Sequence, residues 1–349
     1  MINEIRVCHF ILTRPDSLFS ILSSTFAGMM KKEDLRIVFM GTPEFAVGTL
    51  QRLVEVGYNV VAVVTQPDKP VGRHQDTLQP SEVKRYALEH GLPVLQPEKM
   101  KDPVFVEELR SYGADLQVVV AFRMLPEIVW DMPRFGTFNV HAALLPQYRG
   151  AAPINWAVIN GETKTGVTTF FLDHDIDTGR IIMQKPFPIP DDADVEYVYD
   201  GLMHLGADIA VETIDRILEG DGQVEAVPQE EWNANHLETL KPAPKIFKET
   251  CRIDWNKSAK QVYDFVRGLS PYPGAWTTLV SPDGKSTVLK IFKTAKVDTA
   301  QTGSAIRVEG KKLMVGGLEL VELQLTGKKR MLARDFLNGF REIEKYLIK

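Results

Sequence analysis

The segment Phe138–Pro153, which reads FNVHAALLPQYRGAAP, decides how the rest of the chain is interpreted. Asn139 and His141 lie two positions apart near its start, so an extended backbone points both side chains to one face of a sheet. Residues 116–122 (LQVVVAF) form a continuous apolar run before it, which is typical of a strand buried on both faces. Because open α/β sheets bind ligands at the carboxyl ends of their strands, we expect Asn139 and His141 beside a ligand crevice.

A third polar group lies in the carboxylate-rich segment 173–179 (DHDIDTG), where Asp177 precedes Thr-Gly. An amide, an imidazole and a carboxylate can together stabilise an oxyanion and move protons during acyl transfer. Taken singly, each residue has a plainer interpretation: Asn139 as a turn former, His141 as a hydrogen-bonded core histidine and Asp177 as an Asx turn. Their combination around one motif favours the catalytic interpretation.

The elements on either side of this motif alternate between strands and helices, which predicts a parallel sheet. Residues 36–40 (RIVFM) form a first strand followed at once by GTPEF, with a helix expected to begin near Pro43. This start resembles a dinucleotide-binding fold but lacks the GxGxxG fingerprint, which argues against a nicotinamide dehydrogenase. Further strands are expected at 60–65, 92–95, 165–172 and 180–189, and further helices at 81–90, 103–112, 154–160 and 195–218.

The length of 349 residues exceeds one typical domain, so two are expected. We predict an α/β fold with an N-terminal Rossmann-like parallel-sheet catalytic domain at 35–219 and a linker at 220–244. A small OB-type β-barrel follows at 245–349, with five short strands and a final helix at 333–347. Residues 1–34 are predicted to be an N-terminal extension, with the natural translation start at Met29 or Met30.

The charge is distributed unevenly along the chain. The residues from 241 onward contain 21 Lys and Arg against 11 Asp and Glu, a net charge of +10, and the remainder carries 20 against 35, or −15. A basic C-terminal third on an acidic body predicts a polyanionic partner, although lysines also serve solubility in small β domains. Two cysteines without metal-ligand spacing predict a cytoplasmic protein that needs no metal, and no apolar run reaches the roughly 20 residues that span a bilayer.

The motifs NVH, LLPQYRGAAPI and DTG, together with the upstream GTPEF, resemble those of the methionyl-tRNA formyltransferase family, from about Leu35 to the C-terminus. The resemblance implies transfer of the formyl group of 10-formyltetrahydrofolate to methionyl-initiator-tRNA, with Asn139, His141 and Asp177 as the catalytic residues. It implies folate and tRNA as partners. We also expect the protein to be a monomer that does not associate with a membrane. The C-terminal barrel would be the tRNA-binding domain.

The resemblance also implies two sets of binding residues. Folate contacts are expected from Phe122, Arg123, Met124, Leu125, Ala143, Leu144, Leu145, Pro146 and Asp175. Contacts with tRNA are expected from Arg73, in the long loop 66–80, and from Arg149, Lys328, Lys329 and Arg330.

Two stretches depart from the family pattern. Lysines commonly follow the loop arginine in the family, whereas His74, Gln75 and Asp76 follow Arg73 here. The stretch 122–126 (FRMLP) is one residue shorter than the family's aromatic-glycine-x-x-leucine-proline, so Arg123 is either a new pocket residue or an outward surface arginine.

Two other functions fit part of the sequence. A folate-dependent formyltransferase acting on a sugar nucleotide or glycinamide ribonucleotide would share the catalytic residues but would not need the basic C-terminal third. A non-catalytic RNA-binding protein would need that third but would not need Asn139, His141 and Asp177 all to be present.

Overall fold

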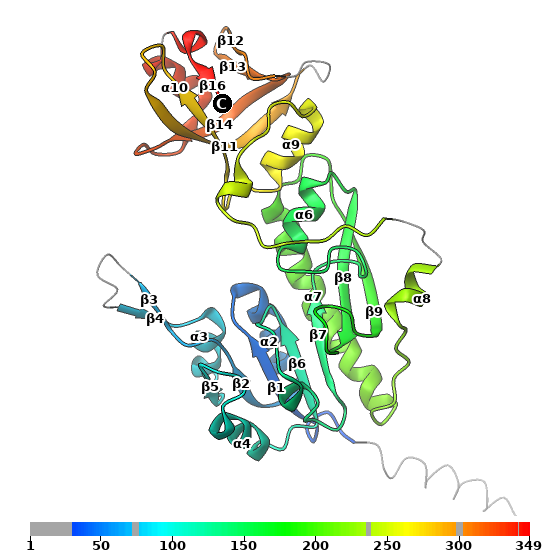
Figure 1. The fold of residues 1–349 in the computed structure, drawn as a ribbon. Coiled ribbons are helices and arrows are strands. Elements are labelled where there is room, and N and C mark those ends of the chain that lie inside the picture. The colour runs from blue at the N-terminus through cyan, green and yellow to red at the C-terminus, as the bar shows by residue number, and fades with distance from the viewer. Residues whose placement is uncertain (1–29, 72–76, 235–238, 298–302, 341) are drawn as a thin grey trace, which may run out of the picture.

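The computed structural model describes residues 30–71, 77–234, 239–297, 303–340 and 342–349. The predicted extension up to residue 29, its start methionine Met29 and the loop residue Arg73 lie outside this described part. Within it, the chain forms an α/β domain followed by an antiparallel, barrel-like domain, which confirms the predicted fold class (Figure 1).

The first domain is built on a sheet with the strand order β5-β2-β1-β6-β7-β8-β9. The pairs from β5 to β7 are parallel, whereas β8 pairs antiparallel with both β7 and β9, so the sheet is mixed rather than wholly parallel. The connection between β8 and β9 is too short for the helical crossover that a parallel pair requires. The strands are β1 (Arg36–Gly41), β2 (Asn59–Val64), β5 (Val94–Leu95), β6 (Leu116–Val120), β7 (Thr137–His141), β8 (Lys164–Phe171) and β9 (Ile181–Pro188).

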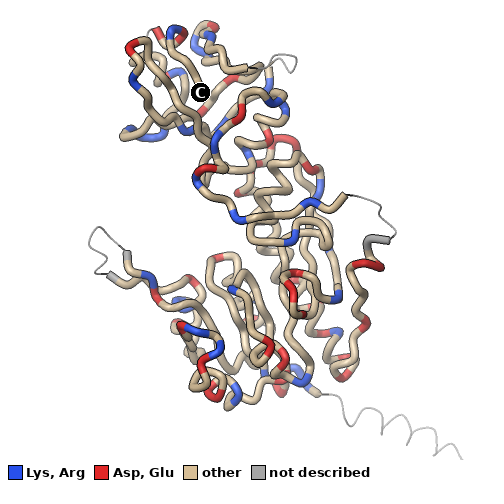
Figure 2. Tube along the Cα trace, viewed as in Figure 1, with Lys and Arg blue, Asp and Glu red and all other residues tan. Residues whose placement is uncertain are grey.

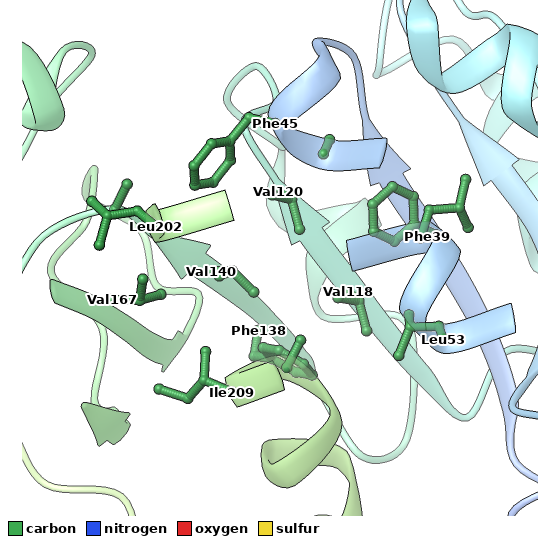
Figure 3. Close-up of a cluster of buried hydrophobic side chains, with 14 of the residues drawn as sticks. Phe39, Phe45, Leu53, Val118, Val120, Phe138, Val140, Val167, Leu202 and Ile209 are labelled. Atoms are coloured by element: carbon green, nitrogen blue, oxygen red, sulfur yellow. The ribbon is translucent and has the colours of Figure 1, made fainter. Parts of the chain in front are cut away.

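Helices cover both faces of this sheet, because its central strands are apolar on both sides. In β1, Phe39 packs in the core beneath α2 and α7, while its neighbour Met40 packs in a second core beneath α4 and α5. Figure 3 shows Phe39, Val118 and Phe138 in the first of these cores. The helices of this domain are α2 (Glu44–Glu55), α3 (Glu82–Glu89), α4 (Pro103–Ser111), α5 (Glu127–Trp130), α6 (Pro153–Ile159) and α7 (Val195–Glu219).

Local capping sets where several of these helices begin. Ser81 is the N-cap of α3 and accepts a hydrogen bond from the backbone N–H of Lys84 at 3.1 Å. The Asp194 carboxylate does the same for Tyr197 at the start of α7, also at 3.1 Å. The long helix α7 therefore starts at a fixed point and packs along α2 and β8.

Part of the loop predicted at 66–80 is a two-stranded antiparallel ribbon. Its strands β3 (Lys69–Val71) and β4 (Thr77–Gln79) pair with each other and project away from the main sheet (Figure 1). Period-two alternation is absent from this proline-containing stretch, so no strand is predicted there.

The C-terminal domain is an antiparallel sheet in the order β12-β13-β14-β11-β10-β16, with β15 paired to β14. Its core gathers Trp255, Ile291 and Leu320, with α9 packed on β11. Helix α9 begins with a capping box formed by Ser258 and Gln261. The elements are α9 (Ala259–Arg267), β10 (Ala275–Val280), β11 (Ser286–Lys296), β12 (Ile306–Glu309), β13 (Lys312–Val315), β14 (Leu318–Leu325), β15 (Met331–Leu332), α10 (Ala333–Gly339) and β16 (Leu347–Ile348).

The helix predicted at 333–347 is wrong over its second half. Helix α10 ends at Gly339, and Ile343–Lys345 forms a single 3₁₀ turn. The last residues pair instead with β10, where Ile348 lies opposite Leu279. Ile343 and Ile348 are buried in the domain core through this turn and strand, so tertiary packing overrides the helical spacing of the apolar residues.

The polar segment at 220–244 includes a short helix, α8 (Gln229–Ala234), which was not predicted. The two domains also meet directly beside this segment. Asn155 on α6 donates to the carbonyl of Gly268 at 2.9 Å, and the Arg267 guanidinium donates to the carbonyl of Ala193 at 2.7 Å. These contacts join the end of α9 to the first domain.

Candidate active site

A cavity of about 870 Å³ lies at the carboxyl ends of β1, β6 and β7. The chain winds outward from β1 through β2 to β5 and then returns to β6 on the other side of β1, so this edge is a topological switch point. Asn139, His141 and Asp177 all line the cavity, as the spacing of the first two and the motif of the third predicted. The volume lies within the range of sites that hold a small organic substrate.

His141 is the last residue of β7, and its side chain is 6% exposed. Its Nε2 lies 2.9 Å from the carbonyl oxygen of Tyr148. A carbonyl can only accept, so Nε2 carries the hydrogen of this bond and Nδ1 is the nitrogen left for chemistry. Nδ1 faces Oδ2 of Asp177 at 3.8 Å. This distance is longer than a hydrogen bond, so the two side chains would have to move closer together before a proton could pass between them.

Asp177 lies in the loop between β8 and β9, with its side chain 13% exposed. Its backbone φ is 55°, in the left-handed region that disfavours side-chain-bearing residues other than Asn and Asp. The backbone N–H of Gly150 donates to the same Oδ2 at 2.9 Å, which aims the carboxylate at His141. Gly150 itself has a φ of 125° and approaches Ala243 so closely that an added Cβ would lie 2.5 Å from its carbonyl oxygen. The glycine of the YRG motif is therefore required by this close approach.

Asn139 has a buried Oδ1 atom without a hydrogen-bond partner among the described residues. A buried polar atom left unpaired costs about 1–3 kcal/mol, so such atoms concentrate where a ligand completes the bonding. Since the amide of Asn can present either its NH₂ or its oxygen, Asn139 is available to donate to a substrate oxygen in the cavity.

The apolar wall of the cavity comes from the stretch after β6, where the sequence analysis placed folate contacts. Phe122, Arg123, Met124 and Leu125 line it, and Asp175 lines it from the β8–β9 loop. Arg123 also donates to the carbonyls of Pro97 and Glu98, the latter at 2.8 Å, so it braces this wall rather than pointing outward. Burial lowers the pKa of the Arg123 guanidinium below its ordinary value.

Four other residues predicted to contact folate do not line the cavity: Ala143, Leu144, Leu145 and Pro146. After β7 the chain turns toward β8, where Thr168 donates to the carbonyl of Ala143 at 2.6 Å and accepts from the N–H of Leu145 at 3.1 Å. Their side chains are therefore committed to packing, and the cavity is lined instead by Ala142.

The residues predicted to contact tRNA are dispersed. Lys328 and Lys329 are exposed in the turn before β15, on the C-terminal domain, whose basic residues are visible in Figure 2. Arg330 is held by both carboxylate oxygens of Glu322 at 2.6 Å. Arg149 donates from Nε and Nη2 to Oε1 of Gln229 at 3.0 and 2.6 Å, close to the Asp177 loop.

The C-terminal domain contributes Tyr272 to the same cavity, a residue that the sequence analysis did not select. Its side chain is 82% exposed, and Pro271 beside it also lines the cavity. Lys290 donates to the carbonyl of Pro273 at 2.9 Å, and the N–H of Gly274 donates to Leu269, so the loop that carries Tyr272 is anchored. The sequence signal for this residue is its position between two prolines, which restrict the backbone on both sides of it. An exposed aromatic side chain can be held in place in this way without being buried.

Within the described residues, no group of three or more His, Cys, Asp or Glu side chains is arranged to hold a metal ion. In the same part of the chain, no helix has the length and apolar character needed to cross a membrane.

Comparison with known families places these features in context. Residues 35–214 match the model of the formyl transferase family, and residues 245–341 match the model of its C-terminal domain. Methionyl-tRNA formyltransferase of Parabacteroides distasonis is 61% identical over 326 residues, which covers 91% of this chain and all of that protein. The chain belongs to the methionyl-tRNA formyltransferase family. The enzyme of the same name from Phocaeicola vulgatus is 62% identical over 319 residues, which covers 89% of this chain and 98% of that one.

Solved structures of more distant proteins share the fold. HypX from Aquifex aeolicus, in complex with tetrahydrofolic acid, has a TM-score of 0.58 at 18% identity, covering 88% of this chain and 48% of HypX. An N-formyltransferase from Helicobacter canadensis, in complex with folinic acid and dTDP-3-aminofucose, has a TM-score of 0.56 at 18% identity, covering 85% of this chain and all of that one. At this identity the likeness concerns the fold alone.

Proposed function

We propose that the protein transfers the formyl group of 10-formyltetrahydrofolate to the α-amino group of methionyl-initiator-tRNA. The observation that carries this proposal is the convergence of Asn139, His141 and Asp177 on one cavity in a chain that is 61% identical to a methionyl-tRNA formyltransferase. The reaction forms a bond between the amine nitrogen and the formyl carbon and breaks the bond from that carbon to N10 of the folate. The amine loses a proton, and N10 gains one.

The attack places negative charge on the formyl oxygen, which needs a hydrogen-bond donor already in position. Asn139 fits this role, since it lines the cavity and its side-chain NH₂ group is a hydrogen-bond donor. A preorganised donor of this kind contributes about 10²–10³ in rate.

The attacking ammonium must become an amine, and the leaving nitrogen must be protonated. Asp177 would accept the amine proton, and His141 would stabilise the oxyanion and pass a proton to N10. Because Nε2 of His141 is held by Tyr148, this transfer would run through Nδ1, the nitrogen that faces Asp177. The Gly150 N–H keeps the carboxylate in that orientation.

The cavity has the composition expected for the folate donor. Its apolar wall at Phe122, Met124 and Leu125 suits a pterin ring, and Asp173 and Asp175 provide acceptors for ring N–H groups at the opposite loop. The three apolar residues line the cavity whereas residues 143–146 do not, so the stretch after β6 is the segment proposed to hold the folate.

The tRNA would approach from the C-terminal domain. Lys328 and Lys329 are exposed there and suit phosphate contacts, and Tyr272 presents an aromatic face at the cavity on which the terminal base of the acceptor end can stack. Such a contact would hold the acceptor end of the tRNA at the cavity that Asn139, His141 and Asp177 line. A monomer, a cytoplasmic location and a mechanism without a metal belong to the same proposal.

The test is a formylation assay with the full chain and 10-formyltetrahydrofolate as donor. Methionyl-initiator-tRNA, free methionine and a dTDP-amino sugar are offered separately as acceptors. We expect transfer to the charged tRNA and none to the other two. Transfer to the amino sugar, with none to the tRNA, would overturn the proposal.

A further inference from the structure

The segment that joins the two domains does more than connect them, because it lies against the catalytic loops at both of its ends. Val227 forms an isolated antiparallel bridge with Ile181, directly after the Asp177 loop. Further along, Ala243 donates its N–H to the carbonyl of Arg149 at 2.8 Å and bridges Gly150. The linker therefore contacts the two stretches that hold the catalytic carboxylate.

Gln229, the first residue of α8, is a linker residue whose side chain contacts the turn that carries this carboxylate. It is 1% exposed, although glutamine is seldom fully buried. Its Nε2 donates to the carbonyl of Asp177 and to the carbonyl of Gly179, both at 2.9 Å. One amide group thus spans the two ends of the Asp-Thr-Gly turn.

Arg149 fixes which way this amide points. Its guanidinium donates twice to Oε1 of Gln229 and has no acceptor atom, so the oxygen must face Arg149 and the NH₂ must face the turn. The four hydrogen bonds use the donor and acceptor capacity of the amide in a buried setting. Because the Gln229 amide has no donor or acceptor left for a substrate, its role is to hold the backbone of the turn.

The turn that Gln229 holds needs this support. Asp177 has a φ of 55°, a conformation that costs of order 1 kcal/mol for a residue with a side chain. The direction of its carboxylate depends on this backbone, since among the residues that the structure describes only the Gly150 N–H and the more distant His141 ring contact Oδ2. If the Asp177 carbonyl were released, the turn could relax and carry the carboxylate away from Nδ1 of His141.

We propose that Gln229 is a positioning residue for Asp177, so that the interdomain linker forms part of the active site. The inference rests on the proposed function, because it assigns a role within that reaction. Gln229 lies behind the loop and not on the cavity, so it holds the carboxylate without touching a substrate.

The expected effect is on turnover and not on binding. Displacing a catalytic group by about 1 Å typically lowers the rate by about 10²-fold, so Gln229→Ala should lower kcat by about 10- to 100-fold. The KM values for tRNA and for the folate should stay within about twofold of wild type, because the lost contacts are with the loop backbone. A variant that had instead lost a contact made equally to substrate and transition state would show a raised KM at unchanged kcat.

Two further variants make the test specific. Gln229→Glu keeps two oxygens for Arg149 and removes both donors to the turn, so it should lower kcat at least as much as Gln229→Ala. Gln147→Ala is the matched control, because Gln147 also ties the linker to the catalytic domain through Thr239 and Lys241, at 3.2 and 2.8 Å, without touching the Asp177 turn. Its kcat should stay within about twofold of wild type.

All variants are measured as full chains against wild type in the formylation assay, with thermal unfolding monitored alongside. Lower kcat in both Gln229 variants, with unchanged KM and an active Gln147→Ala, supports the inference. A wild-type kcat in Gln229→Glu, an equal loss in Gln147→Ala, or a raised KM at unchanged kcat would each overturn it. If Gln229→Ala fails to fold, the folded Gln229→Glu protein decides. An inactive wild-type chain would instead count against the proposed function.

Discussion

Replacing Asp177 by Asn removes the carboxylate charge while keeping the shape of the side chain. An amide oxygen can still accept the Gly150 N–H that Oδ2 accepts at 2.9 Å, so the loop should keep its place. The change therefore removes the acceptor for the amine proton and also the negative charge that would face His141, 3.8 Å away, in the protonated form that the proposed proton transfer requires.

The size of that interaction follows from the distance and from burial. Two unit charges at 3.8 Å interact by about 1 kcal/mol in bulk water and by about 4 kcal/mol at the effective dielectric constant of about 20 that suits partly buried pairs. The side chains are 6% and 13% exposed, so the second value applies. We therefore expect Asp177→Asn to lower kcat by about 10³-fold.

The assay measures single-turnover formylation of methionyl-initiator-tRNA at saturating folate, with tRNA affinity measured separately. The melting temperature should stay within about 4 °C of wild type, because the buried hydrogen bond to Gly150 is retained. Asp131→Asn, at an exposed residue after α5 that does not line the cavity, controls for the loss of one negative charge. A kcat within about threefold of wild type in Asp177→Asn would refute the proposed role of the carboxylate.

Three further changes test other parts of the proposal. His141→Ala should lower kcat by about 10²–10⁴-fold. Its affinity for tRNA, measured by filter binding, should stay nearly unchanged. Turnover near the wild-type value would exclude His141 from the mechanism. Exchanging both Lys328 and Lys329 for Gln should raise the KM for tRNA and reduce the slope of log KM against log salt concentration by about one per phosphate contact; an unchanged slope would place tRNA elsewhere. Tyr272→Ala should raise the KM for tRNA by about 5- to 100-fold at unchanged kcat, and Tyr272→Phe should restore it; equal KM values in the two variants would argue against stacking.

The position of Asn139 and His141 beside the cavity could be predicted from the sequence, because it depends on residues that are close together in the chain. Asn139 and His141 share a face through the two-residue period of a strand, and the buried run before them indicates where in the sheet they lie. The helix expected at 81–90 likewise depends on local order, since Ser81 caps the start of α3 through its own side chain.

Predictions that depended on distant packing were less successful. The apolar residues of 343–348 have a spacing suited to a helix. The last two residues of this stretch instead pair as a strand with β10, where Ile348 lies opposite Leu279, and this pairing decides their conformation. Residues 143–146 lie shortly after His141, yet the bend toward β8 turns them away from the cavity.

The sequence by itself determined the α/β alternation, the β-rich basic C-terminal third and the family motifs, since each is written in short-range spacing and composition. Only the tertiary structure decided that a linker glutamine bonds to the Asp177 turn and that a tyrosine of the C-terminal domain lines the same cavity as Asp177. Gln229 and Tyr272 are 52 and 95 residues away from Asp177 along the chain. Their approach depends on how the two cores pack and where the linker returns, and no local pattern of hydrophobic or turn residues encodes such a contact.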